Sequence, residues 1–329
     1  MQTLIRLALI GAGGVLLLSA GHFTLAAADS PRKRNPGLAL DLPPGTPLSL
    51  PTSSSEGLCT ETIRIDITRK RILVEYNDVA PVKNGRLDPA SMNGHRIIPL
   101  TDEMNRQTRR LRKIEKLSGG KYPFMGTVLL LADASTPYRL VVDVLHTAAF
   151  AGQSHPSVMT LAAHQPPAQH GAKAPNKRHP VTRCIDVSSP PPPVARATTN
   201  PSDPRRTPVP LNLTVAVANS GIFVGAAGEM IRGPDGTLPT LRCTRKLEHG
   251  RCPDSAFDAK TGRWSDAQDF RGLVRLATRL KGKHPLERTV IVAAEATTSW
   301  QTVIRALDAL RGAQGHPLFD RPVLSVGPE

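Results

Sequence analysis

The stretch VLLLADASTPYRLVVDVLHT, residues 128–147, predicts a strand, a tight turn and a helix in direct succession. Its first four residues are an apolar run of the length expected for a buried strand. The small and polar residues 132–136 predict a turn, and Pro137 suits the first position of a helix, where its missing N–H costs nothing. The apolar residues that follow recur at helical spacing: Val141, Val142, Leu145 and Ala149.

A second copy of this unit lies 162 residues further along the chain, as VIVAAEATTSWQTVIRALDA at residues 290–309. The identical pairs are Val128/Val290, Ala132/Ala294, Ala134/Ala296, Thr136/Thr298, Val141/Val303 and Leu145/Leu307. Three further pairs keep their chemical type: Asp133/Glu295, Ser135/Thr297 and Tyr138/Trp300. Because the matches fall in the strand, the turn and the helix alike, they predict an internal repeat of one folding unit.

The composition is that of compact parts joined by unstructured ones. The chain has 329 residues, enough for two domains that each bury a core, yet aromatic residues make up only 4% and there are 31 prolines. The formal net charge of +15 is compatible with a nucleic acid, with a membrane surface or simply with solubility. Because the charge is scattered and lacks the interleaved aromatic residues of RNA-binding proteins, we expect no nucleic-acid partner.

The N-terminus predicts export. Residues 7–28 are apolar except for Ser19, His22 and Thr24, and this run is just long enough to span a bilayer. It ends in three alanines, 26–28, which form an A-x-A cleavage pattern before Asp29. The basic residues 32–34 follow the apolar run, and the positive-inside rule opposes an anchor with its N-terminus inside. Two localisations therefore stay open: a single bacterial inner-membrane anchor with periplasmic domains, or secretion to the periplasm after signal-peptide cleavage.

Four cysteines agree with an oxidising compartment: Cys59, Cys184, Cys243 and Cys252. None forms a C-x-x-C motif, so neither a zinc knuckle nor a thioredoxin-type redox site is indicated. Four cysteines allow three pairings. The local spacing favours Cys243 with Cys252, which leaves Cys59 to pair with Cys184.

The order of patterns predicts two tandem small α/β (α+β) domains, each built as hairpin, helix, strand, helix and strand. Residues 1–28 are the leader, 29–56 a flexible tether, and 57–164 the first domain. Residues 165–210 form a linker with 12 prolines, and 211–329 the second domain. In the first domain we expect a hairpin at 63–75, a basic amphipathic helix at 101–117 and a closing strand at 157–163. In the second, Ser265 with Gln268 predicts a capping box at the start of a helix.

These units resemble the ExbD/TolR family of biopolymer-transport proteins. The resemblance rests on VLLLADASTPYRLVVDVLHTA and VIVAAEATTSWQTVIRALDALRG, because family members carry a strand ending in Ala-Asp, a turn, an aromatic residue and a helix with a Val-Val-x-x-Leu-like face. It implies a membrane anchor, a periplasmic α/β domain that dimerises, and a multi-span motor partner of the ExbB/TolQ type. That complex uses the proton gradient to drive processes at the outer membrane.

The chain departs from the family in two respects. Family members carry an aspartate inside the membrane segment that takes up and releases the proton, whereas residues 7–28 contain no acidic residue. His22 is the only titratable group there, and we do not expect it to conduct protons. The tandem arrangement also allows one chain to supply the pseudo-dimer that two chains make in the family, with a homodimer as the alternative.

The expected function is therefore a non-catalytic envelope component of a biopolymer-transport or motility complex driven by the proton gradient, without carrying the proton itself. The alternative is an exported periplasmic binding scaffold with the same fold and no motor. We expect no enzyme activity and no cofactor, because no nucleophile with a base and an orienting group, and no nucleotide-binding glycine loop, is present.

The remaining candidate residues have structural interpretations. Asp133 and Glu295 are expected to cap the N–H groups of the helices that follow them. Tyr138 and Trp300 are expected to pack in the core. The histidines in or beside the linker are too irregularly spaced for a metal site: His164, His170 and His179. The basic helix at 101–117 is expected to be a solvated face, with contact to an anionic envelope polymer as the alternative.

Overall fold

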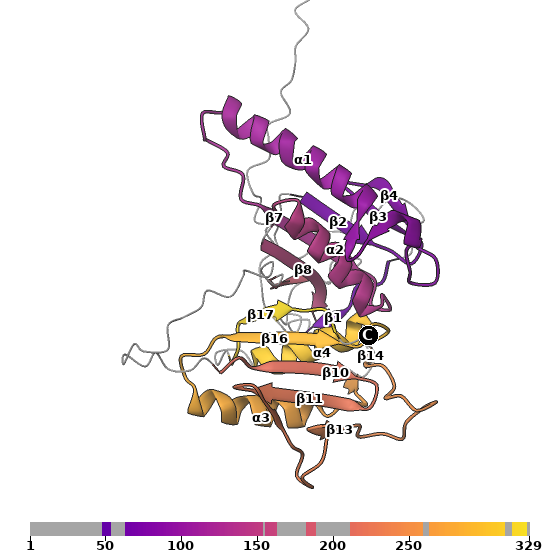
Figure 1. Cartoon of the computed structure of the whole chain (residues 1–329), viewed down its shortest axis with the longest axis vertical. Coiled ribbons are helices and arrows are strands. Elements are labelled where there is room, and N and C mark those ends of the chain that lie inside the picture. The colour runs from indigo at the N-terminus through magenta and orange to yellow at the C-terminus, as the bar shows by residue number, and fades with distance from the viewer. Residues whose placement is uncertain are drawn as a thin grey trace, which may run out of the picture. The chain divides into compact units, whose positions relative to one another are not determined.

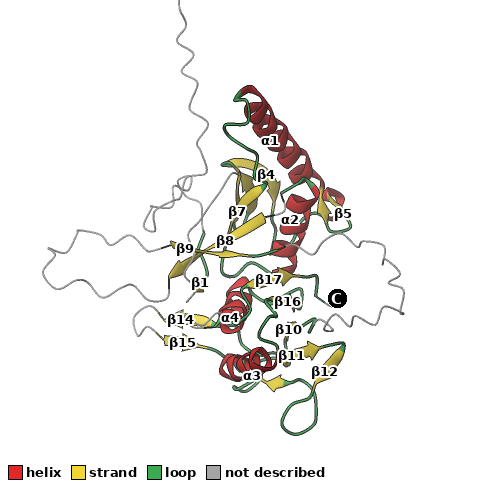
Figure 2. Ribbon diagram, turned by 90° about the vertical axis from the view of Figure 1, so that its left-hand side faces the viewer, coloured by secondary structure: helices red, strands yellow, loops and turns green. Residues whose placement is uncertain are grey.

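The computed structural model describes residues 48–53, 63–153, 155–162, 182–188, 211–258, 263–312 and 318–327. Over these residues the protein is a mixed α/β structure with four α-helices and several sheets (Figures 1 and 2). The leader with His22, the residue Cys59 and the three linker histidines fall outside the described ranges. Of the helices that are described, none is both long enough and apolar enough to cross a bilayer.

The first half of the chain forms a seven-stranded sheet and two helices. The elements are β1 (Thr52–Ser53), β2 (Ile63–Ile67), β3 (Arg71–Val74), β4 (Asn77–Pro81), a 3-10 turn (Pro89–Ser91), β5 (Met92–Asn93), β6 (Arg96–Ile97), α1 (Ile98–Leu117), β7 (Thr127–Ala132), α2 (Tyr138–Phe150), β8 (His155–Ala162) and β9 (Thr182–Asp186). The strand order is β1-β8-β7-β2-β3-β4, and β9 pairs with β8. The pairs β2/β7 and β7/β8 are parallel, as crossover connections through α1 and α2 require.

Both faces of this first sheet are covered. Ile63, Ile65 and Ile67 of β2 pack with α1 and α2 on one face. The opposite face carries a smaller apolar cluster of Leu50, Leu129, Leu131, Met159 and Cys184. Residues 63–68 alternate apolar and polar side chains, a pattern typical of a strand with one solvated face, but here the polar face is buried as well. Arg64 and Asp66 are buried there too, which is possible because they bond to each other.

The second half repeats the arrangement with a smaller sheet. Its elements are β10 (Thr214–Ala218), β11 (Gly221–Ala226), β12 (Glu229–Ile231), β13 (Leu241–Arg242), β14 (Ala256–Asp258), β15 (Arg263–Ser265), α3 (Phe270–Lys283), β16 (Thr289–Ala294), α4 (Trp300–Arg311) and β17 (Arg321–Leu324). The order is β12-β11-β10-β16-β17, with β13 on β11. Position for position this matches β4-β3-β2-β7-β8 of the first half, and Figure 2 shows α3 beside α4 as α1 lies beside α2.

Two predicted helix starts differ from the structure. Helix α2 begins at Tyr138 rather than Pro137, because Pro137 has the extended backbone of an N-cap. Ser265 belongs to β15, so the predicted capping box does not form. Asp269 is the N-cap of α3 instead, and its Oδ1 accepts the N–H of Gly272 at 2.7 Å.

A middle part of the expected linker and the end of the expected tether take part in the first sheet. Strand β9 lies within residues 165–210 and pairs antiparallel with β8, placing Cys184 opposite Met159. Strand β1 lies within residues 29–56 and pairs with β8 in parallel. A short β-bridge also joins Ser188 to Val323 of β17, so the segment after β9 contacts both halves.

Candidate functional site

The two repeated turns bind each other through reciprocal backbone hydrogen bonds. The N–H of Tyr138 donates to the carbonyl of Thr298 at 2.8 Å, and the N–H of Trp300 donates to the carbonyl of Thr136 at 2.8 Å. Tyr138 and Trp300 are equivalent in the repeat, as are Thr136 and Thr298. Each helix therefore begins where the turn of the other repeat supplies an acceptor.

A second pair of bonds obeys the same symmetry. The N–H of Arg139 donates to the carbonyl of Ala296 at 3.2 Å, and the N–H of Gln301 donates to Ala134 at 2.9 Å. The first N–H groups of any helix have no acceptor within the helix. Here the carbonyls of the opposite turn supply it, and neither α2 nor α4 has a side-chain cap bond. Backbone pairing between the repeats thus replaces conventional capping at this junction.

The carboxylate of Asp133 holds the turn and not the helix, which corrects its expected capping role. Its Oδ1 accepts the backbone N–H of Ser135 at 2.9 Å and the hydroxyl of Ser135 at 2.5 Å. Its Oδ2 accepts the N–H of Ser49 at 2.9 Å, so the segment that precedes β1 is tied to the turn. Burial alone would raise the pKa of Asp133, but these bonds and the charge of Arg69 outweigh it and lower the pKa below its ordinary value.

Glu295 occupies the equivalent turn and makes the equivalent backbone bonds. Its N–H donates to Val217 at 3.0 Å and its carbonyl accepts the N–H of Thr298 at 2.9 Å, as Asp133 bonds Ile67 and Thr136. Its half-buried side chain makes no hydrogen bond to another described residue, so it caps neither α4 nor the turn. The feature that the two turns share is therefore the pattern of backbone hydrogen bonds and not the role of the carboxylate.

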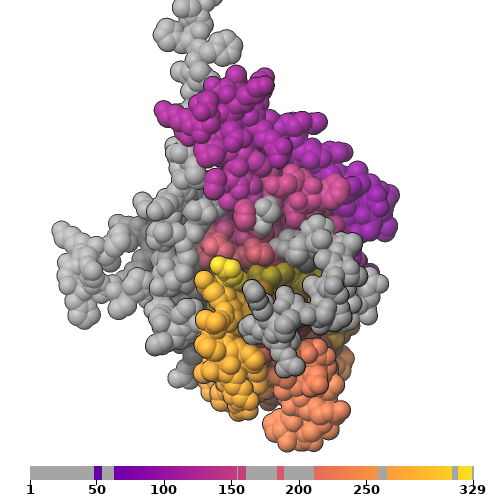
Figure 3. Space-filling model, turned by 60° about the vertical axis from the view of Figure 1, so that its left-hand side comes forward, coloured from indigo at the N-terminus to yellow at the C-terminus, as the bar shows by residue number. Residues whose placement is uncertain are grey.

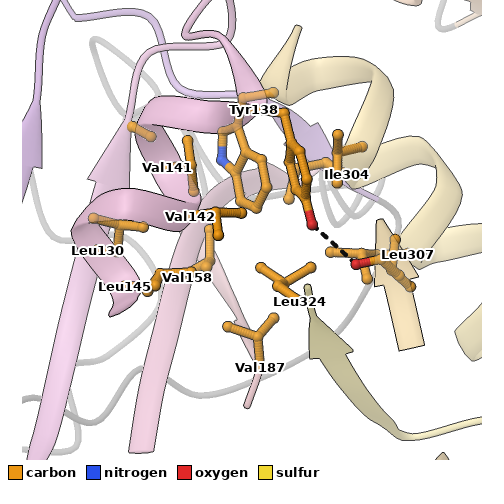
Figure 4. Packing of buried hydrophobic residues seen from close by; sticks show 14 of the residues in the cluster. Leu130, Tyr138, Val141, Val142, Leu145, Val158, Val187, Ile304, Leu307 and Leu324 are labelled. Atoms are coloured by element: carbon orange, nitrogen blue, oxygen red, sulfur yellow. Dashed lines mark hydrogen bonds between the residues drawn. The ribbon is translucent and has the colours of Figure 1, made fainter. Parts of the chain in front are cut away.

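Tyr138 and Trp300 pack in the core, as expected for them. They are 1% and 0% exposed, and both belong to a hydrophobic cluster that contains residues of both halves. In Figure 4 the ring of Tyr138 points towards Ile304 and Leu307 of α4, which belong to the other half. The tyrosine hydroxyl lies 2.9 Å from the carbonyl oxygen of Val292 and 2.6 Å from that of Ser325. Burial raises its pKa, so it remains a protonated donor.

Further contacts join the halves away from the repeated turns. The amide side chain of Gln301 accepts the N–H of Thr52 at 2.8 Å and donates to the carbonyl of Thr52 at 2.9 Å. The hydroxyl of Ser53 donates to Asp308 at 2.6 Å. The N–H of Ser188 donates to Pro322, and the N–H of Leu324 donates to Ser188, at 2.9 Å each. Strand β1 of the first sheet therefore fastens α4, and Ser188, after β9, fastens β17.

A titratable cluster that the sequence did not single out lies on α2 and the β5–β6 hairpin. Nδ1 of His95 lies 2.8 Å from Oδ1 of Asp143, and Nε of Arg139 lies 3.1 Å from both carboxylate oxygens. The ring of His146 is 5.8 Å from that of His95. Burial raises the pKa of Asp143 against the opposing effects of His95 and Arg139. Burial, followed by repulsion from His95, lowers the pKa of His146.

Sequence signals for this cluster are weak. Arg139 and Asp143 stand four residues apart on one helix, a spacing that favours an ion pair. His95 comes from a separate hairpin, 48 residues before Asp143, and no local pattern links them. Within the described ranges no nucleophilic side chain is bonded to the His95–Asp143 pair, so the cluster has the geometry of a structural hydrogen-bonded pair.

The cysteines and metal-binding residues complete the account of predicted sites. Cys243 and Cys252 are paired as a disulfide with Cα atoms 5.9 Å apart. Cys184 is buried in β9, and its expected partner Cys59 is outside the described ranges. Within those ranges no group of three or more histidine, cysteine or acidic residues is arranged to hold a metal ion.

No family model matches the chain, and neither the curated proteins nor the solved structures contain a match to it.

Proposed function

We propose that this protein is a non-catalytic component of the cell envelope, of the ExbD/TolR type, in which the two halves of one chain form the paired unit that two chains form in that family. The observation that carries the proposal is the reciprocal pairing of the repeated turns, Tyr138 with Thr298 and Trp300 with Thr136. A pairing between equivalent residues is the signature of two-fold symmetry, which homodimers use at their interfaces.

The chemistry of the conspicuous residues supports a structural role. The single hydroxyl proton of Tyr138 faces two buried carbonyls, those of Val292 and Ser325, and the carboxylate of Asp133 holds a turn and Ser49. Buried side chains that already form hydrogen bonds within the protein make the fold rigid, and a substrate cannot reach them. The proposed role is thus to present a stiff double domain in the periplasm to a proton-driven, multi-span motor protein.

The proton step is assigned to the partner and not to this chain. The leader, residues 7–28, has no acidic group, and His22 lies near its outer end. A residue that cycles between charged and neutral forms in a membrane is normally an acid facing a polar path. On this proposal the exchange His22→Ala leaves function intact.

The test is affinity purification of the full chain, tagged at its C-terminus, from gently solubilised membranes. We expect recovery of a multi-span protein of the motor family and a native mass that corresponds to one copy of this chain per paired unit. The mass of the mature N-terminus is measured on the same sample. A cleaved, freely soluble protein without a membrane partner would support the exported scaffold instead, and a stable homodimer would refute the pseudo-dimer within the chain.

A further inference from the structure

The C-terminal part of α1 extends beyond the core of the first half. The buried residues of this helix all lie in its first eleven positions: Leu100, Thr101, Met104, Gln107 and Thr108. From residue 109 to residue 117 no side chain is fully buried. Leu117 is 76% exposed, and Met125, in the loop that follows, is 53% exposed. The helix therefore carries a free end with apolar side chains in water.

The same end is strongly basic, because residues 109–117 hold five cations and a single acidic residue, Glu115. Among the described residues, no acidic group forms an ion pair with any of the five basic side chains of this end: Arg109, Arg110, Arg112, Lys113 and Lys116. Glu115 is engaged, since its Oε1 accepts the N–H of Phe124 at 3.2 Å. Glu103 lies closer to the N-terminus of α1 than the basic end, and it already forms an ion pair with Arg106. Figure 3 shows the magenta α1 segment at the surface of the molecule.

Two aromatic residues of the following loop lie close to cations, one cation on the helix end and one in the loop itself. The guanidinium of Arg112 is 5.5 Å from the ring centre of Phe124, and Nζ of Lys121 is 5.7 Å from that of Tyr122. The contact of Arg112 with Phe124 and the bond from Phe124 to Glu115 hold the loop against the helix, so Met125, next to Phe124, is presented at the same end as Leu117 and the cations. Basic side chains surrounding a small apolar tip are the combination that binds a membrane interface.

We propose that the tip formed by residues 109–125 docks on a bilayer surface rich in anionic phospholipid. The cations meet the lipid phosphates, and Leu117 and Met125 enter the boundary between headgroups and acyl chains. Charge complementarity favours this occupant, because each basic residue near an anionic leaflet adds to binding and exposed apolar side chains gain from leaving water. A purely polar anionic polymer would use the cations but would leave the apolar tip in water.

The experiment places a reporter at the tip of the full chain. The exchange Leu117→Trp is made at an exposed position, and the protein is combined with vesicles containing brominated lipids, which quench only a tryptophan that enters the bilayer. Vesicles of phosphatidylcholine with phosphatidylglycerol are compared with vesicles of phosphatidylcholine alone. A chain without the Leu117→Trp exchange gives the background from Trp264 and Trp300. We expect additional quenching with the anionic vesicles, little with the neutral ones, and a decrease at high salt.

A matched pair of triple variants separates the local patch from net charge. In the Leu117→Trp background, R110Q, K113Q and K116Q remove three charges beside the tip. In the control, K70Q, K83Q and R86Q remove three exposed charges elsewhere in the same half. We expect the first variant to lose the additional quenching and the control to keep it. Equal loss in both variants, equal quenching with neutral vesicles, or no quenching beyond the background would each overturn the proposal. A response to soluble anionic polysaccharide without quenching by vesicles would assign the tip to a polymer.

Discussion

The phenolic oxygen of Tyr138 lies 2.9 Å from the backbone carbonyl oxygen of Val292, a contact between the first residue of α2 and strand β16 of the other half. Trp300, the equivalent of Tyr138, is buried as deeply, but its Nε1 has no hydrogen-bond partner in the described structure. The two repeats are thus symmetric in backbone pairing and asymmetric in side-chain bonding. The tyrosine gives the junction a specific polar bond that the tryptophan does not.

We predict that Tyr138→Phe lowers the free energy of unfolding by about 1–3 kcal/mol, because the carbonyl of Ser325 loses its buried donor. Val292 is less affected, since its carbonyl also accepts the N–H of Ser325 at 2.9 Å. The measurement is chemical denaturation followed by circular dichroism. Tyr122→Phe is the matched control, because the hydroxyl of Tyr122 makes no hydrogen bond to the described residues. An unchanged midpoint for Tyr138→Phe would show that the hydroxyl is not needed at the junction.

The two halves share one hydrophobic core, which leads to a second prediction. Leu307 is fully buried, and in Figure 4 it lies in the same cluster as Val142 of the first half. Leu307→Ala should cost about 2–5 kcal/mol, the usual range for a buried leucine. Hydrogen exchange should show weaker protection in both halves, because they share this core. Leu286, which is 91% exposed, provides the control exchange Leu286→Ala with little expected effect. Weakening confined to the second half would indicate two independent cores.

Cutting the chain between the halves tests the junction directly. We predict that a specific protease site introduced between residues 201 and 208 yields two fragments that remain together in size-exclusion chromatography. The reciprocal backbone bonds and the common core hold them, and a Cys59–Cys184 disulfide would lie within one fragment and does not connect the two. Separation of the fragments under native conditions would contradict this interpretation. Cleavage of the Leu307→Ala variant should weaken the association, which can be measured by dilution.

The cluster at His146 predicts a dependence of stability on pH. The pKa of His146 is lowered, first by burial and then by the charge of His95, so the folded protein disfavours its protonated form. Its Nδ1 is buried without a hydrogen-bond partner among the described residues. A group with a lowered folded-state pKa contributes stability above its unfolded pKa, and that stability is lost as the pH falls through the folded-state value. For a histidine with an ordinary value of 6.5, the loss begins below about pH 6.5.

The measurement is the difference between the native protein and His146→Asn across pH 7 to pH 5. Asp143 acts in the opposite sense, because burial raises its pKa and its contribution is lost as the pH rises through that value. Both proteins contain His95, Asp143 and Arg139, so the difference between the two curves reports the titration of His146 together with its coupling to His95 and Asp143. We expect the variant to lose less stability on acidification. The exposed residue His249 gives the control His249→Asn, which should follow the native curve. Parallel curves for the native protein and His146→Asn would refute the prediction.

Local patterns were sufficient for the order hairpin, helix, strand, helix and strand in both halves, but not for the further strands β4 to β6 and β12 to β15. The apolar run at 128–131 and the helical spacing from Val141 to Ala149 are reproduced by β7 and α2. Such patterns act over a few residues, because a strand or a helix needs only its own periodicity to expose an apolar face. The start of α2 was misplaced by one residue, since the acceptors for its first N–H groups come from the other repeat.

Contacts between residues far apart in the sequence could be seen only in the tertiary structure. The bond from the N–H of Trp300 to the carbonyl of Thr136 uses only backbone atoms, which every residue carries, so no choice of side chain announces it. The same holds for burial of Arg64 and Asp66, whose alternation with isoleucines is that of a solvated face. The pairing of His95 with Asp143 requires a hairpin to be laid against α2. The sequence pattern shows which side chains are polar. Only the packing of the tertiary structure determines which of them obtain a hydrogen-bond partner and can therefore be buried.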